Sequence, residues 1–114
     1  MRDDRLRLGD IVFAIDHVLQ FTSGKTRDDM AADLQLLSAV LYQLSIIGEA
    51  TANVSRRLKS KYPAVDWRAF SDFRNEILHD YFTLDIGIVW DTIQTELPKM
   101  RAHLTDLLRT EFPE

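Results

Sequence analysis

Residues 30–58, MAADLQLLSAVLYQLSIIGEATANVSRRL, decide the fold. Apolar residues and one glycine recur through this stretch at spacings of mainly three and four residues, which places them on one helical face. They are Met30, Leu34, Leu37, Leu41, Leu44, Gly48, Val54 and Leu58. Thr26 and Asp29, three residues apart, match a helix-capping box just before the stretch, and Pro63 follows it. The pattern predicts one long central helix that ends near Lys61.

Gly48 interrupts a run of good helix formers within this predicted helix. A glycine in a helix interior costs about 1 kcal/mol relative to alanine, so the position needs another reason for the small residue. We expect a second backbone to lie close to the central helix at Gly48.

The rest of the chain is also helical in pattern. A first helix is predicted from about Asp4 to Phe21, where Ser23-Gly24 provides a stop. Asp66 can cap a third helix that begins at Trp67, and Asp85 can cap a fourth. The apolar stripe of the fourth helix keeps one register straight through a proline, which predicts a bend but no break: Ile86, Trp90, Ile93, Leu97, Pro98, Met100, Leu104 and Leu107.

No alternating strand pattern or repeat appears, so the sequence predicts an all-α, up-down bundle of four to five helices. With 114 residues, the chain is expected to form one domain over residues 1–114. A domain of this size has little room for a deep internal pocket, which favours a site between two subunits. A short Phe82-Thr83-Leu84 connection is expected to follow the third helix.

Composition limits the classes of function. There is no cysteine, which excludes disulfides and thiolate metal sites and is typical of a cytoplasmic protein. We expect no membrane association, because no apolar run reaches the length of a membrane span and the N-terminus does not resemble a signal peptide. The net charge of −4 argues against broad, non-specific binding of nucleic acid, so any RNA contact must be local.

Residues 74–81, RNEILHDY, gather groups that can handle a phosphodiester within about two helical turns. Arg74 offers a fixed fork of donors for phosphate oxygens. His79 can move a proton near physiological pH. The amide of Asn75 and the phenol of Tyr81 add polar groups on either side.

A helical projection separates these residues. Arg74 falls in the middle of a broad apolar arc, where an unpaired guanidinium would cost several kcal/mol and therefore needs a carboxylate, a ring face, a subunit cleft or a phosphate. His79 lies about 140° away from it. The apolar arc consists of Trp67, Phe70, Phe73, Ile77, Leu78 and Tyr81, and a separate polar stripe consists of Arg68, Asp72, Asn75 and His79.

This stretch resembles the R-x4-H-x-Y motif of the HepT-like toxins in the HEPN superfamily. Residues 47–50, IGEA, resemble the sequence in the middle of a helix in that family, and residues 65–67, VDW, resemble the approach to its motif helix. Trp90 and Leu97-Pro98 resemble landmarks of its closing helices. Four landmarks in the family's order make the resemblance more specific than the short motif by itself.

The resemblance implies a homodimer with the motif at the subunit interface, acting as a metal-independent endoribonuclease on mRNA or tRNA without a cofactor. His79 would be the general base or acid for attack of a ribose 2′-hydroxyl on the adjacent phosphorus, and Arg74 would stabilise the developing charge. Asn75 would orient His79 or the phosphate. The family also implies a small nucleotidyltransferase antitoxin that attaches adenylyl groups to the motif tyrosine, here Tyr81.

Several residues have simpler interpretations. Arg74 can form a buried ion pair with Glu49, which is compatible with catalysis because a carboxylate can orient the guanidinium. Asp72 is a second candidate orienting carboxylate. A histidine near a helix end usually interacts with the helix dipole, so without the resemblance His79 would be a weak candidate. Glu76 and His79 match half of a di-iron motif, but no second copy exists, and we therefore expect no metal.

A basic segment at the end of the predicted central helix also has two interpretations. The helix dipole favours positive charge there, and the same charges are candidates for contacts with an RNA backbone. The candidate RNA-contacting residues are Arg56, Arg57, Lys59, Lys61 and Arg68.

Three functions remain open from the residues. The first is RNA cleavage; the second is a non-catalytic helical-bundle subunit that binds a nucleotidyltransferase; the third is nucleotide binding without cleavage. The chain contains no G-x-S-x-G, Walker, dinucleotide-binding or His-Glu-x-x-His motif, which leaves conventional hydrolase, NTPase and zinc chemistry without support.

Overall fold

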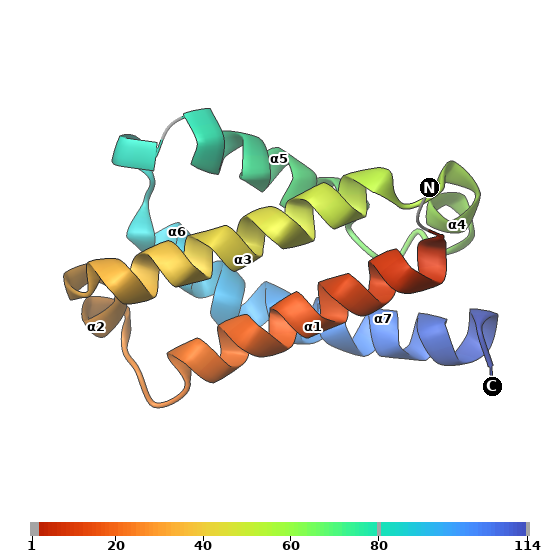
Figure 1. Ribbon diagram of the computed structural model, residues 1–114, viewed down its shortest axis with the longest axis horizontal. Coiled ribbons are helices and arrows are strands. Elements are labelled where there is room, and N and C mark those ends of the chain that lie inside the picture. The colour runs from red at the N-terminus through yellow and green to blue at the C-terminus, as the bar shows by residue number, and fades with distance from the viewer. Residues whose placement is uncertain (1–2, 80, 114) are drawn as a thin grey trace.

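The computed structural model describes residues 3–79 and 81–113, except for the side chain of Tyr81, and this part of the chain contains helices and no strand (Figure 1). The all-α prediction is therefore confirmed. The elements are α1 (Asp4–Thr22), α2 (Arg27–Ala32), α3 (Leu34–Asn53), α4 (Arg56–Lys61), α5 (Trp67–His79), the 3₁₀ turn η1 (Tyr81–Thr83), α6 (Ile86–Asp91), the π turn η2 (Thr92–Glu96) and α7 (Leu97–Glu111).

The prediction of four to five helices is too low, because the expected central helix is divided into α2, α3 and α4. With α6, η2 and α7 counted as one continuous helix, the described residues form six α-helices. Asp33 takes an extended conformation, with φ −116° and ψ 97°, so it ends α2 and caps α3 by accepting a hydrogen bond from the Leu36 N–H. Val54 is also extended and ends α3.

Ser55 begins α4 and ties it to the first helix. Its hydroxyl accepts a hydrogen bond from the Leu58 N–H at 3.2 Å, which is the usual N-cap contact. Its own N–H and hydroxyl donate to the Asp4 carboxylate at 2.9 and 2.5 Å. The start of α4 is therefore held against the first turn of α1.

The other predicted helix ends are confirmed. Gly24, at φ 73°, follows the end of α1 in the left-handed conformation that glycine favours. Thr26 and Asp29 form both hydrogen bonds of the capping box. Asp66 accepts a hydrogen bond in the first turn of α5, and Asp85 caps α6.

The last helix also passes through its proline as predicted. Pro98 lies in the first turn of α7, directly after the π turn Thr92–Glu96, and the backbone remains helical on both sides. A π turn rearranges the hydrogen bonds next to a residue that has no N–H, so a proline can follow it without breaking the helix.

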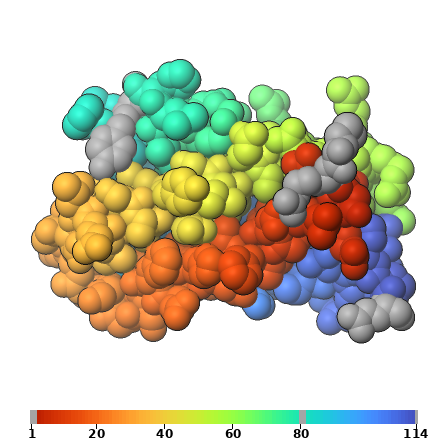
Figure 2. All heavy atoms as spheres, in the orientation of Figure 1, coloured from red at the N-terminus to blue at the C-terminus, as the bar shows by residue number. Residues whose placement is uncertain are grey.

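Helix α3 is the centre of the bundle. It packs between α1 and α5, and the continuous α6–α7 segment runs behind them (Figure 1). Figure 2 shows that α1, α3 and α5 share the face turned toward the viewer. The side chains that are fully enclosed come mainly from α1, α3 and the α6–α7 segment and include Leu8, Ile11, Ile15, Leu44, Ile47, Leu58, Ile93, Leu97 and Leu104. Helix α5 adds Trp67, Phe70 and Ile77, which are 5–7% exposed.

Helices α3 and α5 approach each other closely at Gly48. A Cβ atom built on Gly48 would lie 2.4 Å from the Phe70 carbonyl oxygen and 2.6 Å from the Arg74 Cβ. The expectation that a second backbone lies close to this glycine is confirmed. Because no larger residue fits without displacing α5, Gly48 determines how near Arg74 lies to the central helix.

Replacing Gly48 with alanine should destabilise the fold, because the new methyl group meets a backbone carbonyl that cannot easily move. We expect the free energy of unfolding to fall by about 1–3 kcal/mol, as for other overpacked sites. Gly9 is the matched control, since it is also helical but has nothing within 4 Å of the position that a Cβ atom would take. Gly9→Ala should stabilise the protein by about 0.5–1 kcal/mol. Equal effects of the two changes in urea denaturation would contradict this account of Gly48.

Candidate functional site

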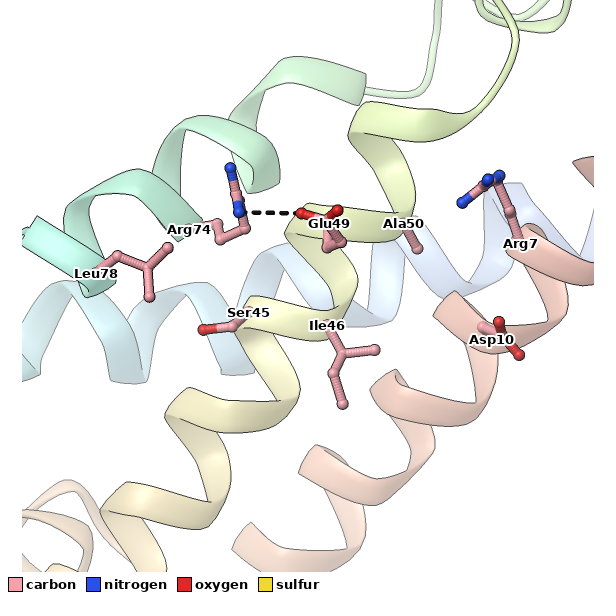
Figure 3. Close-up of a pocket in the computed structure, with 8 residues that line it drawn as sticks. All are labelled: Arg7, Asp10, Ser45, Ile46, Glu49, Ala50, Arg74 and Leu78. Atoms are coloured by element: carbon pink, nitrogen blue, oxygen red, sulfur yellow. Dashed lines mark ion pairs between the residues drawn. The ribbon is translucent and has the colours of Figure 1, made fainter. Parts of the chain in front are cut away.

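The candidate site is a groove of about 340 Å³ on the face formed by α1, α3 and α5 (Figure 3). Its walls come from three helices that are far apart in sequence, so only the folded bundle creates it. Polar and apolar side chains both line the groove: Arg7 and Asp10 from α1, Ser45, Ile46, Glu49 and Ala50 from α3, and Arg74 and Leu78 from α5.

Arg74 is held at the edge of this groove by two neighbours. Its Nη1 lies 3.0 Å from Glu49 Oε2, and its Nη2 donates a hydrogen bond of 3.2 Å to Asn75 Oδ1. The predicted pair with Glu49 forms, but the expectation that it is buried is wrong. The Arg74 side chain is 31% exposed and that of Glu49 is 60% exposed, so the pair is largely solvated and orients the guanidinium more than it stabilises the fold.

One donor of Arg74 has no acceptor among the described residues. Its Nε is buried and makes no hydrogen bond, whereas both terminal nitrogens are engaged. A guanidinium has five N–H donors, and Glu49 and Asn75 accept from only part of them. Arg74 therefore keeps hydrogen-bonding capacity that the described chain does not fill.

His79 is not brought to the same groove. It is the last residue of α5, it is exposed, and it is not among the residues that line the groove. No hydrogen bond joins His79 to Arg74 within the described chain, which agrees with their expected separation around the helix. A single chain thus brings together Arg74, Asn75 and Glu49 and leaves His79 apart.

The remaining predicted site residues on α5 lie at its surface. Arg68 and Asp72 are exposed, and neither side chain forms a hydrogen bond or ion pair with another described residue. Asp72 is therefore not placed as an orienting carboxylate for Arg74. The backbone of Tyr81 begins the turn η1, and its side chain lies outside the described residues. Phe82, which follows it, is 97% exposed.

The basic segment on α4 is partly neutralised by the fold. Lys61 Nζ lies 2.5 Å from Glu111 Oε1, and this hydrogen-bonded contact raises the pKa of Lys61. Lys59 donates to the Ala52 carbonyl at 3.3 Å, and partial burial lowers its pKa. Arg56 and Arg57 are exposed, and neither side chain forms an ion pair with another described residue, so they are the least occupied RNA-contact candidates on α4.

The groove contains residues that the sequence did not single out. Arg7 and Asp10 are the clearest cases, because they bring a second pair of opposite charges to the site from α1. Their spacing of three residues places them on one side of the helix. Nothing in that spacing reveals that this side of α1 faces Arg74 across α3.

Two further findings concern the described residues as a whole. No three histidine, aspartate or glutamate side chains among them lie close enough together to hold a metal ion. None of the helices they form has the length and the apolar character needed to cross a membrane.

Comparison with known proteins places this geometry in a family. The family model described as "Ribonuclease HepT-like" matches residues 11–107, which include α3, α5 and the whole R-x4-H-x-Y stretch. A protein of Thermococcus cleftensis named "Probable ribonuclease HepT" is 31% identical over 100 residues, covering 88% of this chain and 91% of the relative. No solved structure matches.

Two proteins of Methanocaldococcus jannaschii are also similar. The one named "Putative RNase MJ0127" is 29% identical over 108 residues, covering 95% of this chain and 89% of the relative. The one named "Gamma-glutamylcyclotransferase and putative RNase MJ0434" is 28% identical over 107 residues. That match covers 94% of this chain but only about half, 48%, of the longer relative. The extent of the family match and the level of identity lead to one conclusion: the chain belongs to the HepT-like ribonuclease family of the HEPN superfamily.

Proposed function

We propose that this chain is the toxin of a toxin-antitoxin pair and acts in the cytoplasm as a metal-independent endoribonuclease on mRNA or tRNA. The observation that carries the proposal is the position of Arg74. Its Cβ lies against Gly48, where α3 and α5 approach closely. Its guanidinium is oriented by Glu49 and Asn75. The side chain lines a groove of about 340 Å³, in which part of an RNA strand can lie.

In the proposed reaction, His79 removes the proton from a ribose 2′-hydroxyl, and the 2′-oxygen attacks the adjacent phosphorus. The bond from phosphorus to the 5′-oxygen of the next nucleotide breaks, and that oxygen takes a proton from a general acid. The products are a 2′,3′-cyclic phosphate and a 5′-hydroxyl. Arg74 stabilises the negative charge on the phosphoryl oxygens during the attack, and Asn75 holds the guanidinium or the phosphate in position.

A homodimer would bring an Arg74 and a His79 from different protomers into the same site. Within one chain His79 does not line the groove that contains Arg74, so we propose that the motif helices of two protomers face one shared cleft. Exposed apolar side chains on the three helices that form the groove support this arrangement: Phe13 on α1, Tyr42 on α3 and Leu78 on α5 are each 60–66% exposed, and Leu78 lines the groove itself. Exposed apolar patches of this kind are typical of interfaces.

The dimer proposal predicts that a charge placed beside the groove separates the protomers. Leu78→Asp should shift the protein from dimer to monomer at micromolar concentration, as measured by light scattering. Ile88→Asp is the matched control, because Ile88 is 58% exposed but lies on α6, outside the groove. It should leave the dimer intact. A wild-type protein that is monomeric under these conditions would contradict the proposal.

The chemical proposal predicts cleavage without a metal ion. The purified protein should cut RNA in the presence of EDTA and leave a 2′,3′-cyclic phosphate or its hydrolysis product. His79→Ala should reduce cleavage by at least about 100-fold, the usual contribution of a general base or acid, with little loss of stability because His79 is exposed. His103→Ala, an exposed histidine on α7, should have no effect.

Other results would redirect the assignment. Cleavage that stops with EDTA, or that leaves a 5′-phosphate and a free 3′-hydroxyl, would indicate metal-assisted hydrolysis. RNA that stays intact with wild-type protein, combined with tight binding of a nucleotidyltransferase, would favour the non-catalytic subunit. Arg74→Ala should also reduce cleavage, but it removes packing beneath Gly48, so circular dichroism must accompany that assay.

We further propose that a partner nucleotidyltransferase controls the enzyme through Tyr81, two residues after His79. Transfer of an adenylyl group from ATP forms a bond between the phenol oxygen and the α-phosphorus, and pyrophosphate leaves. The attached phosphodiester adds a negative charge and a purine beside the proposed cleft. Repulsion of RNA phosphate and occlusion then act together, and Arg74 can bind the attached phosphate in place of substrate.

This control predicts a specific modification. Incubation with the cognate nucleotidyltransferase, ATP and Mg²⁺ should add one or more AMP units to Tyr81 and stop RNA cleavage without unfolding the protein. Tyr81→Phe should keep at least part of its activity and escape the control, while Tyr42→Phe, at an exposed tyrosine on α3, should still be modified and silenced. Peptide mass spectra without an adduct on Tyr81, or a modified protein of unchanged activity, would favour simple steric binding by the partner.

A further inference from the structure

The groove contains a second arginine, Arg7, which has no part in the proposed mechanism. Arg7 extends from α1 toward α3, and Arg74 reaches the opposite side of the groove from α5, with Glu49 between them (Figure 3). The two guanidinium groups therefore flank one stretch of α3. A ligand that lies along the groove meets positive charge at both ends.

The guanidinium groups of the two arginines differ in the number of contacts that they make within the chain. Arg74 pairs with Glu49 and bonds to Asn75, whereas Arg7 forms no ion pair with any residue in the described ranges. Asp10, one turn along α1, is itself engaged in an interaction. Arg7 is half-buried, so its stem is held against the bundle while its donors are available to a ligand.

The floor of the groove between the arginines is mainly apolar. Ile46 and Ala50 line it, and Ser45 adds one hydroxyl. The Glu49 carboxylate, paired with Arg74, also lies between the arginines, whereas Leu78 lies beyond Arg74 (Figure 3). The groove volume of about 340 Å³ is near the lower limit for small-ligand pockets, which suits one nucleotide. Proteins that bind single strands track phosphates with cations and stack bases on aromatic side chains. This groove has the cations, and its apolar surface is aliphatic.

The start of α4 is held against the first turn of α1, the helix that carries Arg7. Asp4, three residues before Arg7, holds Ser55 at the start of α4 by two hydrogen bonds. The exposed Arg56 and Arg57 follow Ser55 directly. Two further exposed arginines therefore lie near the end of the bundle where α1 begins.

We propose that Arg7 is a substrate-positioning residue that binds an RNA phosphate next to the one held by Arg74, on a single strand whose base rests on the apolar floor. The inference rests on the proposed ribonuclease function and adds a second phosphate contact to it. Arg7 touches no reacting atom in this role. It fixes the register of the strand relative to the scissile bond.

The test measures binding separately from cleavage. A fluorescent single-stranded RNA of about twelve nucleotides, within the range of site sizes for such proteins, is titrated with His79→Ala protein and followed by anisotropy. Adding Arg7→Gln should weaken binding roughly tenfold, as for loss of a hydrogen-bonded charge. The slope of log affinity against log salt should also fall by about 0.7, the value for one phosphate contact on a single strand. Arg7→Lys should restore the slope and only part of the affinity.

Arg5 provides the matched control. It is an exposed arginine on the same helix, two residues earlier, and it does not line the groove. Arg5→Gln should leave the affinity unchanged. Equal affinities and equal salt slopes for the Arg5→Gln and Arg7→Gln proteins would overturn the inference, since a merely structural role of Arg7 does not change the salt slope.

A cleavage assay on the protein with His79 intact separates this inference from the function on which it rests. If the wild-type protein cleaves RNA and Arg7→Gln leaves KM unchanged, the inference fails while the ribonuclease proposal stands. If the wild-type protein does not cleave RNA but the Arg7→Gln change lowers affinity and salt slope, the ribonuclease proposal fails and the phosphate contact stands. We expect Arg7→Gln to raise KM more than it lowers kcat.

Discussion

The contact between Gly48 and α5 determines the rest of the site. Because the Phe70 carbonyl and the Arg74 Cβ occupy the space where a larger residue would place its Cβ, α3 and α5 approach closely at the level of the motif. The arginine is thereby brought beside the Glu49 carboxylate, one residue further along α3. A wider spacing would separate the ion pair and open the groove wall. A missing side chain on one helix thus positions the charged side chain on its neighbour.

Local features of the fold could be predicted, because each depends on residues close together in sequence. The caps at Thr26, Asp66 and Asp85 and the passage through Pro98 are of this kind. The division of the central helix was missed, although Asp33 is an N-cap residue by type. The apolar stripe of the predicted central helix continues in nearly the same register across Asp33 and Val54. Periodicity therefore does not reveal the two short interruptions at these residues.

The candidate site also has features that could be predicted from the sequence and features that could not. The pair of Arg74 with Glu49 could be predicted, because an arginine within an apolar arc needs a partner and residues 47–50 supplied a carboxylate. The contribution of Arg7 could not be predicted, because it depends on how α1 is rotated against α3. That rotation follows from packing among many core side chains, and no local pattern records it. The separation of His79 from Arg74 follows directly from helical geometry.

The link between Asp4 and Ser55 has a consequence for the order of folding. Helix α4 has six residues, far fewer than a helix needs to persist in water, and its N-cap serine is fixed by a carboxylate that lies 51 positions earlier. Leu58, its one buried residue, is fully enclosed only in the folded bundle. We therefore expect α4 to form late, so that its two exposed arginines reach their final positions after the core is formed.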